Sequence, residues 1–266
     1  MSIDLPVAKK SLGQHWLNDS AALQSICDEG QVSESDTILE IGPGMGTLTD
    51  KLLSTGAKVV AVELDRALTT ILRDKFKGRD LQIHEGNILE YDLSSLPKDY
   101  KVIANIPYYL TSNLIRVLSE TPNQASRVVL LVQKEVAERV AATPGSMSLL
   151  SVSAQYFWDV SLGSVVPAKL FSPPPKVDSQ VLIMSRRQQP LYSVSDPAKF
   201  FQLVKSGFAA RRKTLLNSLS GGLRTEKEQI QRALDQVLID PSRRAQTLSL
   251  DEWHKLYDTC LDLKIL

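Results

Sequence analysis

Cysteine is almost absent from this 266-residue chain, which holds only Cys27 and Cys260, far apart in the sequence. Their spacing excludes a disulfide framework, gives no zinc-ligand pattern and suits a reducing compartment. Apolar runs long enough to span a membrane, about 18 residues, are also missing. Residues 1–10 lack the apolar stretch of a secretory signal. The sequence therefore predicts a globular protein without structural disulfides, bound metal or membrane segment.

A strong net charge is missing too, since 31 Lys and Arg against 30 Asp and Glu give a formal charge of +1. The charges are unevenly distributed, however. Residues 1–185 hold 17 basic and 21 acidic side chains, a net −4, whereas residues 186–266 hold 14 and 9, a net +5. This asymmetry is typical either of a basic region that faces a polyanion or of a solvated helical surface, and both readings stay open.

Short runs rich in Val and Ile alternate with helical patterns in the first two thirds of the chain. This alternation indicates βαβ units and a parallel sheet covered on both faces. The expected strands are 37–41, 58–64, 81–84, 101–104, 128–132, 160–166 and 177–184, and the expected helices are 48–54, 67–76, 112–119, 135–141 and 148–157. Beyond the expected domain boundary at 187/188, four amphipathic helices are predicted over 198–208, 213–219, 227–237 and 251–261. Asp196 and Ser249 are typical helix starts.

The sharpest motif is EIGPGMGT, residues 40–47, between an expected strand and an expected helix. Glycine there lets the backbone turn tightly and approach a ligand closely. The dinucleotide fingerprint is G-x-G-x-x-G, whereas Gly42, Gly44 and Gly46 are spaced G-x-G-x-G. This spacing favours S-adenosylmethionine, which has no pyrophosphate to place at the helix start.

Further cofactor contacts are expected after the next two strands. Glu63, 21 positions after Gly42, can accept hydrogen bonds from both ribose hydroxyls, and Leu64 beside it is an expected contact. Asn87 offers an oxygen for the adenine amino group of the cofactor, and Ile88 an apolar surface for its ring. The plainer alternatives are a surface carboxylate for Glu63 and an ordinary turn residue for Asn87.

Asn105-Ile106-Pro107-Tyr108 follows the fourth expected strand and suits the methylation of an adenine amine. This amine is a poor nucleophile because its lone pair is delocalised into the ring. Acceptors at the Asn105 side chain and the Ile106 carbonyl would favour the pyramidal, nucleophilic form, so that positioning and electrostatics carry catalysis. Tyr108 offers a ring for stacking, and the base must be unpaired or flipped out. Phe171 is expected to cover the other face of the base, unless it is a core phenylalanine.

Together these motifs resemble the rRNA adenine N6,N6-dimethyltransferases. The likeness extends from about residue 9 to residue 250 and includes KSLGQHWL (10–17), EIGPGMGTLT (40–49), NIPY (105–108), QKEVAER (133–139), FSPPPKV (171–177), RRKTL (211–215) and RRA (243–245). It implies a Rossmann-like class I methyltransferase domain, with a seven-stranded, mostly parallel sheet whose last strand is antiparallel, and a small all-helical C-terminal domain. It also implies that His15 and Leu17 contact the cofactor, S-adenosylmethionine. Trp16 and Asn87 stand where the family usually has Phe and Asp.

The resemblance implies that two adjacent adenosines near the 3′ end of small-subunit rRNA are each methylated twice. The expected partner is a pre-ribosomal small subunit. The protein is expected to be a monomer in the cytoplasm of a bacterium. RNA affinity should come from phosphate contacts, for which the candidates are Lys134, Arg139, Lys176, Arg211, Arg212, Lys213, Arg243 and Arg244, although each can equally be a plain surface residue.

Two alternatives remain open at this point. One is the related enzyme group that methylates an adenosine of large-subunit rRNA and confers macrolide resistance; the QKEVAER segment and the basic C-terminal motifs favour the small-subunit group. The other is a mainly non-catalytic factor for ribosome assembly or transcription on the same fold. The presence of Asn105 and Tyr108 favours retained catalysis.

Overall fold

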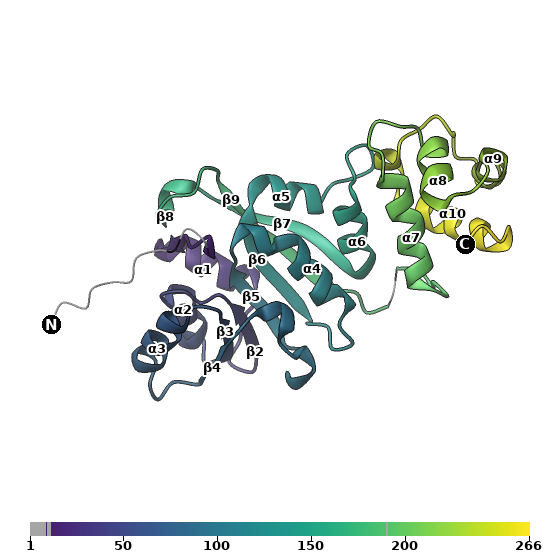
Figure 1. Cartoon of the computed structure of the whole chain (residues 1–266). Coiled ribbons are helices and arrows are strands. Elements are labelled where there is room, and N and C mark those ends of the chain that lie inside the picture. Colours follow the sequence, from purple (N-terminus) through teal and green to yellow (C-terminus); the bar gives the residue numbers. More distant parts are fainter. Residues whose placement is uncertain (1–8, 10–11, 190) are drawn as a thin grey trace. The chain divides into compact units, whose positions relative to one another are not determined.

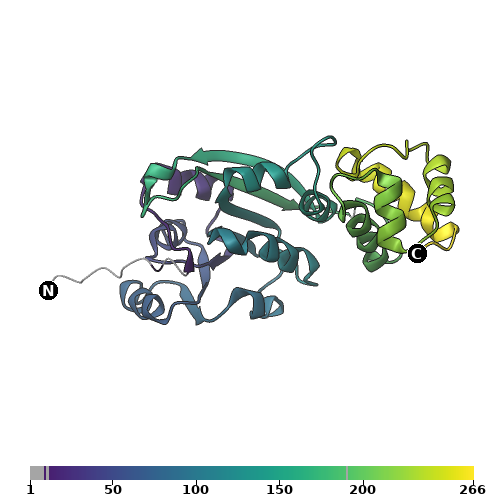
Figure 2. The same ribbon diagram turned by 45° about the horizontal axis from the view of Figure 1, so that its top comes forward.

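The computed structural model describes residue 9, residues 12–189 and residues 191–266, and Figures 1 and 2 show it from two directions. These residues form two compact units, one made of the chain up to Glu138 with Trp158–Arg186, the other of Arg139–Phe157 with Arg187–Leu266. The chain thus crosses between the units beside the predicted boundary at 187/188. Residues 139–157, expected in the first domain, group with the second unit. Within the described ranges, no helix is both long and apolar enough to cross a bilayer.

A seven-stranded sheet is the centre of the first unit. Its strands in spatial order are β4 (Leu81–Glu85), β3 (Lys58–Glu63), β2 (Thr37–Ile41), β5 (Lys101–Asn105), β6 (Arg127–Gln133), β9 (Ser179–Arg186) and β7 (Trp158–Val166). The five strands from β4 to β6 are parallel, and β9 is antiparallel to both of its neighbours. The expected mostly parallel sheet with an antiparallel last strand is confirmed.

Helices cover the sheet as the parallel strands require (Figure 1). They are α1 (Ser20–Glu29), α2 (Thr47–Ser54), α3 (Arg66–Lys75), α4 (Thr111–Glu120) and α5 (Lys134–Val140). In β2, Ile38 belongs to a core cluster with Ile26 of α1 and Leu52 of α2. Leu39, the next residue, points to the opposite face and is also 0% exposed. Both faces of the strand are therefore buried, which explains its continuous apolar sequence.

The strand order reverses direction between β2 and β5. From β2 the chain proceeds through α2 to β3 and through α3 to β4 on one side, and then returns to β5 on the other side. The segments that follow the carboxyl ends of β2, β3 and β5 therefore meet at one edge of the sheet, where ligand crevices form in open α/β folds.

A small second sheet, which the sequence did not predict, pairs β1 (Trp16–Leu17) with β8 (Phe171–Ser172). Leu17 lies opposite Phe171 in this antiparallel pair. The pair ties residues 12–17, here called the strap, to the segment that precedes β9. The strap is thereby held near the carboxyl edge of the main sheet.

The second unit is helical and contains α6 (Leu149–Phe157), α7 (Pro197–Phe208), α8 (Leu215–Leu223), α9 (Lys227–Gln236) and α10 (Leu250–Asp262), seen in green to yellow in Figure 2 apart from the teal α6. Phe200, Trp253 and Tyr257 are fully buried in its core. Both predicted helix starts are confirmed. Asp196 accepts hydrogen bonds from the first turn of α7, and Ser249 forms a capping box at the start of α10.

Leu238, which follows the C-terminal end of α9, has an unusual backbone conformation. Leu238 has a φ of 57°, the left-handed conformation that helix ends normally give to glycine. The Leu238 N–H donates to Asp235 O at 3.1 Å and the Ile239 N–H to Leu234 O at 2.9 Å, which is the hydrogen-bond pattern of a Schellman motif. The Leu238 side chain is 93% exposed, so no packing compensates for its backbone strain.

Candidate active site

The glycine loop, residues 42–46, leaves β2 and enters α2 through left-handed backbone. At Gly44 and Gly46 the φ angles are 59° and 74°, which cost a residue with a Cβ roughly 1–2 kcal/mol. Space also requires glycine here. A Cβ on Gly46 would lie 2.6 Å from the ring of Phe76, and one on Gly44 would lie 3.1 Å from the indole of Trp16. The loop is therefore enclosed between α3 and the strap.

Glu63 binds this loop through its carboxylate. Its Oε2 accepts from the Gly44 backbone N–H at 3.1 Å, and its Oε1 accepts from the Asp65 N–H at 2.8 Å. The side chain is 5% exposed, which excludes the alternative of a surface carboxylate. Burial raises the pKa of the carboxyl, while the backbone N–H donors act in the opposite direction. Each oxygen keeps a second lone pair, so Glu63 can also accept from ribose hydroxyls.

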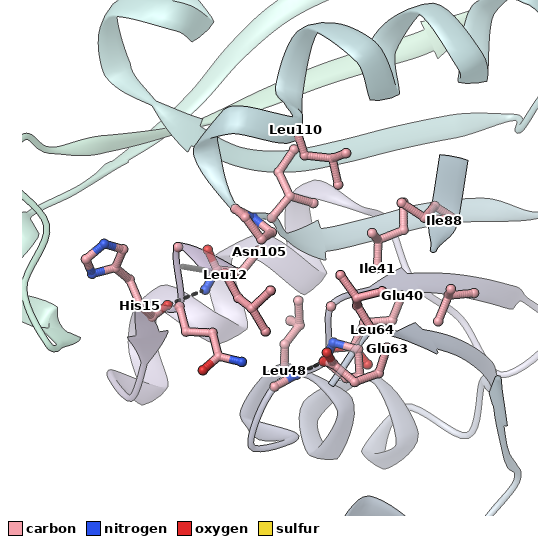
Figure 3. Close-up of a pocket in the computed structure, with 18 of the residues that line it drawn as sticks. Leu12, His15, Glu40, Ile41, Leu48, Glu63, Leu64, Ile88, Asn105 and Leu110 are labelled. Carbon is pink, nitrogen blue, oxygen red and sulfur yellow. Dashed lines mark hydrogen bonds between the residues drawn. The ribbon is translucent and has the colours of Figure 1, made fainter. Parts of the chain in front are cut away.

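A cavity of about 240 Å³ lies at this edge of the sheet (Figure 3). It brings together most of the predicted cofactor and target-base residues, namely His15, Leu17, Gly42, Gly44, Glu63, Leu64, Asn87, Ile88, Asn105, Ile106 and Tyr108. In Figure 3, Glu63, Leu64 and Ile88 lie toward one end and Asn105 and His15 toward the other. Gly46 is not among the described residues that line the cavity. It lies on the side of the glycine loop that packs against Phe76.

Asn105 ends β5 and contacts the strap. Its Nδ2 donates to the backbone carbonyl of His15 at 3.2 Å, the dashed line at the left of Figure 3. Because the nitrogen is committed to the strap, the side-chain oxygen is left to accept from a ligand. Ile106 follows at the wall of the same cavity. Both acceptors predicted for the target amine therefore border one space.

Near Asn105, the rings of Tyr108 and His15 lie nearly parallel, with centroids 6.0 Å apart and planes inclined by 21°. The Tyr108 hydroxyl shares a 2.8 Å hydrogen bond with the Ser179 hydroxyl. Burial raises the pKa of the Tyr108 hydroxyl, so it stays neutral. The Nδ1 of His15 lies 2.7 Å from the Pro173 carbonyl oxygen. Since this oxygen only accepts, Nδ1 carries the hydrogen.

Phe171 does not lie where the sequence led us to expect it. Its side chain is 4% exposed and packs in the core cluster with Leu17, Leu23 and Val181, and it is not among the described residues that line the cavity. β8 pairing directs the ring inward, opposite Leu17. The expectation that Phe171 covers a face of the target base is therefore corrected: the structure gives it the core role.

Asn87 borders the cavity, but its amide is engaged with its own turn. Oδ1 accepts from the Leu89 N–H at 3.1 Å, and Nδ2 donates to Glu90 Oε1 at 3.0 Å. One lone pair of Oδ1 remains, so contact with the adenine of the cofactor stays a prediction. Ile88, 5% exposed, also lines the cavity, and its contact with the ring of the cofactor stays a prediction.

Glu40 and Tyr109 are among the residues that line the cavity and that sequence reasoning did not assign to the site. Glu40 is 1% exposed, and burial raises the pKa of its carboxyl to about 8, with neighbouring Glu63 adding to the rise. The position of Glu40 at the end of a buried strand was the available signal. Tyr109 is 63% exposed and lies beside Gly13, where a Cβ would meet its ring at 3.6 Å. No periodic pattern distinguishes Tyr109 in the sequence.

Four of the predicted RNA contacts come together in the helical unit. Arg139, Arg211, Lys213 and Arg244 line one cavity with Lys205, which the sequence did not single out, and no Asp or Glu is among its described lining residues. Such a concentration of positive charge favours an anionic ligand. The Arg139 Nε is buried without a hydrogen-bond partner among the described residues.

The other basic candidates lie elsewhere. Lys134 and Lys176 border a shallow depression together with Glu135, Glu138 and Asp178, and Arg212 is exposed. Arg243 forms an ion pair with Glu252 at the start of α10 and also donates to the Thr247 carbonyl at 2.7 Å. The guanidinium of Arg243 is thus engaged in holding its own loop.

Comparison with known proteins gives consistent matches over nearly the whole chain. Residues 7–260 match the family model described as ribosomal RNA adenine dimethylase. A protein of Dehalococcoides mccartyi named ribosomal RNA small subunit methyltransferase A is 40% identical over 253 residues, covering 94% of this chain and 87% of its own length.

Two solved structures are also similar. The crystal structure of a dimethyladenosine transferase from Plasmodium falciparum has a TM-score of 0.82 at 26% identity, covering 94% of this chain and 98% of that one. The crystal structure of the 23S rRNA methyltransferase ErmE has a TM-score of 0.75 at 24% identity, covering 92% of this chain and 98% of that one, and supports the fold alone.

Proposed function

The chain belongs to the ribosomal RNA adenine dimethylase family, and from this premise we propose that it methylates N6 of two adjacent adenosines near the 3′ end of small-subunit rRNA, twice each. The name of the Dehalococcoides mccartyi relative supports the small subunit as the substrate. The observation in this chain that carries the proposal is that Asn105, Ile106 and Tyr108 share one cavity with Glu63 and the glycine loop.

S-adenosylmethionine, when bound, supplies an electrophilic methyl group. The chain binds and orients the partners of this reaction. Glu63 accepts from ribose hydroxyls, and Leu64 and Ile88 pack against the purine of the cofactor. Asn105 Oδ1 and the Ile106 carbonyl accept hydrogen bonds from the two N–H groups of the target amine, which draws the nitrogen lone pair out of conjugation with the ring and makes it available for attack.

The basic cavity of the helical unit is proposed to bind RNA phosphates. Arg211, Lys213 and Arg244 can reach an anion from several sides, and counterion release makes such contacts favourable and salt-dependent. Arg139 contributes a buried Nε that lacks a partner among the described residues. Lys134 and Lys176 are weaker candidates because acidic neighbours reduce their net contribution, and Arg212 is weaker because it is not among the described residues that line the basic cavity. Arg243 is proposed to hold the loop rather than the RNA.

We infer that the substrate is a pre-ribosomal small subunit, in which the target base must be unpaired or flipped out to enter the cavity. The enzyme is proposed to act as a monomer. A cytoplasmic location is consistent with the two free, buried cysteines. The helical unit is proposed as the RNA-binding domain and the sheet unit as the methyltransferase domain.

Mapping the modified nucleotides tests the proposed substrate. Unmethylated small subunits and, separately, large subunits are incubated with the protein and labelled S-adenosylmethionine, and mass spectrometry identifies the modified bases. We expect label on two adjacent adenosines of small-subunit rRNA, and none with the Asn105→Ala control. Label confined to a large-subunit adenosine would instead support the macrolide-resistance type of enzyme. A wild type that transfers no methyl group but still promotes subunit maturation would support an assembly factor.

A further inference from the structure

We propose that Tyr109 is a stacking platform for the base that adjoins the target adenosine in the RNA. The inference rests on the proposed function, since it requires an RNA substrate with one base in the cavity, and it extends that function to the neighbouring base. Tyr109 lines the same cavity as Asn105 and Ile106, yet its side chain is 63% exposed. A side chain that combines these two properties lies at the opening of the cavity, where the RNA strand has to pass.

The short 3₁₀ turn Tyr108–Leu110 explains why this ring faces outward. Such a turn has three residues per turn, so successive side chains point about 120° apart. The Tyr108 hydroxyl is hydrogen-bonded to the Ser179 hydroxyl at 2.8 Å, and Leu110 is 8% exposed. Because both neighbours are directed into the protein, the remaining direction, that of Tyr109, is toward solvent.

The strap borders one side of the Tyr109 ring. Gly13 has left-handed backbone with a φ of 62°, and a Cβ at this position would lie 3.6 Å from both Cδ1 and Cε1 of Tyr109. Glycine therefore lets the strap backbone pass beside the ring without a side chain between them. The ring has protein on this side and an open side that is available to a ligand.

The position of this exposed ring is more informative than its exposure. Single apolar side chains are common on protein surfaces. Within the described ranges, however, every other Phe, Trp and Tyr side chain is buried or only partly exposed. The one fully exposed ring of these types thus lies beside the acceptors proposed for the target amine, which favours a contact with the substrate over an ordinary surface position.

Extrusion of a target base deprives its neighbour of a stacking partner. The base that enters the cavity leaves the stack, so the adjoining base exposes one of its faces. Aromatic side chains replace such a lost partner in single-stranded RNA, because every base has a π face. In the proposed substrate, the adjoining base on one side is the other adenosine of the pair. Tyr109 therefore holds one adenosine while the other is methylated.

The test measures the coupling between Tyr109 and the neighbouring base. Small subunits are reconstituted with unmethylated rRNA in which neither, one or the other of the two adenosines is replaced by uridine, which has a smaller stacking face. For wild type and Tyr109→Ala, kcat/KM is measured for methyl transfer to each remaining adenosine. On the unaltered pair, we expect Tyr109→Ala to lose kcat/KM by roughly 5- to 150-fold, the range for one stacked base.

The double-mutant cycle then identifies the stacked base. In at least one of the two uridine substrates, the combined loss should be smaller than the product of the separate losses by about threefold or more. One such substrate is sufficient, because a single ring can meet the neighbour on only one side of the target.

Three further variants separate stacking from other roles of the side chain. Tyr109→Phe keeps the ring and should keep kcat/KM within about threefold, whereas Tyr109→Leu keeps an apolar contact with Gly13 but should behave like Tyr109→Ala. Tyr91→Ala is the matched control, because Tyr91 is a partly exposed tyrosine that is not among the described residues lining the cavity. All variants should keep their calorimetric affinity for S-adenosylmethionine within about twofold of the wild type.

Several results would overturn the inference. Wild-type kcat/KM in Tyr109→Ala or Tyr109→Leu shows that no base stacks on the ring. A loss that is independent of both neighbouring bases assigns the ring to another part of the subunit, such as a ribosomal protein, and a parallel loss of cofactor affinity assigns it to the support of the strap. These results leave the proposed function intact. A wild-type enzyme that is inactive on small subunits refutes that function, and the platform with it. Thermal unfolding of each variant distinguishes lost folding from lost stacking.

Discussion

Replacing Glu63 by Gln tests how the glycine loop is held. The carboxylate accepts two backbone N–H groups, from Gly44 at 3.1 Å and from Asp65 at 2.8 Å. Glutamine has nearly the same shape, but only one of its terminal atoms accepts. One hydrogen bond survives, and the amide nitrogen of the glutamine faces the other N–H as a second donor.

The magnitude follows from these two bonds. A hydrogen bond to a charged group contributes about 1.5–3 kcal/mol, and an unpaired buried donor adds a similar cost. We therefore expect Glu63→Gln to lose about 2–3 kcal/mol of stability. In a domain of this size each kcal/mol corresponds to roughly 2–4 °C in Tm, so Tm should fall by about 4–12 °C. Loss of an acceptor for ribose should also weaken S-adenosylmethionine binding by about tenfold, since tenfold in Kd corresponds to about 1.4 kcal/mol.

Differential scanning calorimetry measures the change in Tm, and titration calorimetry measures the change in cofactor affinity. Glu85→Gln is the matched control because Glu85 lies opposite Glu63 in the parallel register of β4 and β3 but is exposed and is not among the described residues lining the cavity. This control should change Tm by only about 2 °C or less. If Glu63→Gln matched the control in both Tm and affinity, the carboxylate would not be what organises the loop.

Four further predictions concern the active site, the core, a helix end and the RNA surface. Asn105→Ala should reduce methyl transfer by about 100-fold or more while calorimetric affinity for S-adenosylmethionine stays within about threefold; normal turnover would refute the acceptor role. Glu40 has a folded-state pKa of about 8 against an ordinary 4.5, so the stability that its neutral carboxyl contributes is lost as pH rises from about 4.5 through about 8. The Tm of Glu40→Gln, relative to that of the wild type, should therefore rise between about pH 5 and pH 9. A Tm difference that stays constant over this range would contradict the prediction. Leu238→Gly should raise Tm by roughly 2–4 °C by releasing about 1 kcal/mol of left-handed strain, whereas Leu238→Ala should not; a lower Tm for glycine would count against the strain. Lys213→Ala should weaken binding to small-subunit rRNA and flatten its salt dependence by about one phosphate contact; an unchanged slope in a filter-binding assay would remove Lys213 from the RNA surface.

Residues in the active site differ in how far the sequence identified them. The glycine loop and Glu63 were predictable because both combine a strand pattern with a chemistry that few other residues supply at that spacing. Phe171 was not, because an aromatic residue before a proline segment reads the same whether its ring faces a ligand or the core. Only the pairing of β8 with β1 determines which way the Phe171 ring points. A strand of two residues has no periodicity that a sequence pattern could reveal. His15 was predicted at the site, but the direction of its ring depends on Pro173, 158 positions away along the chain.

The fold shows the same division between local and distant determinants. The strands of the main sheet were found at nearly the right residues, since buried parallel strands are continuously apolar. Helix α1 was missed even though Asp19 caps its start with a bond to the Ala22 N–H of 2.8 Å. The grouping of residues 139–157 with the helical unit depends on contacts with a segment some 50 residues later, which no local window of sequence contains.

The grouping of residues 139–157 with the helical unit determines which fragments of the protein can fold by themselves. The helical core contains Val152 and Tyr156 of α6 together with Phe200 and Trp253, so a recombinant fragment that starts at residue 188 would lack part of its own interior and should aggregate. During synthesis the same interior cannot be completed until α10 has left the ribosome. A designed fragment needs residues 139–157 joined by a flexible linker to residues 187–266.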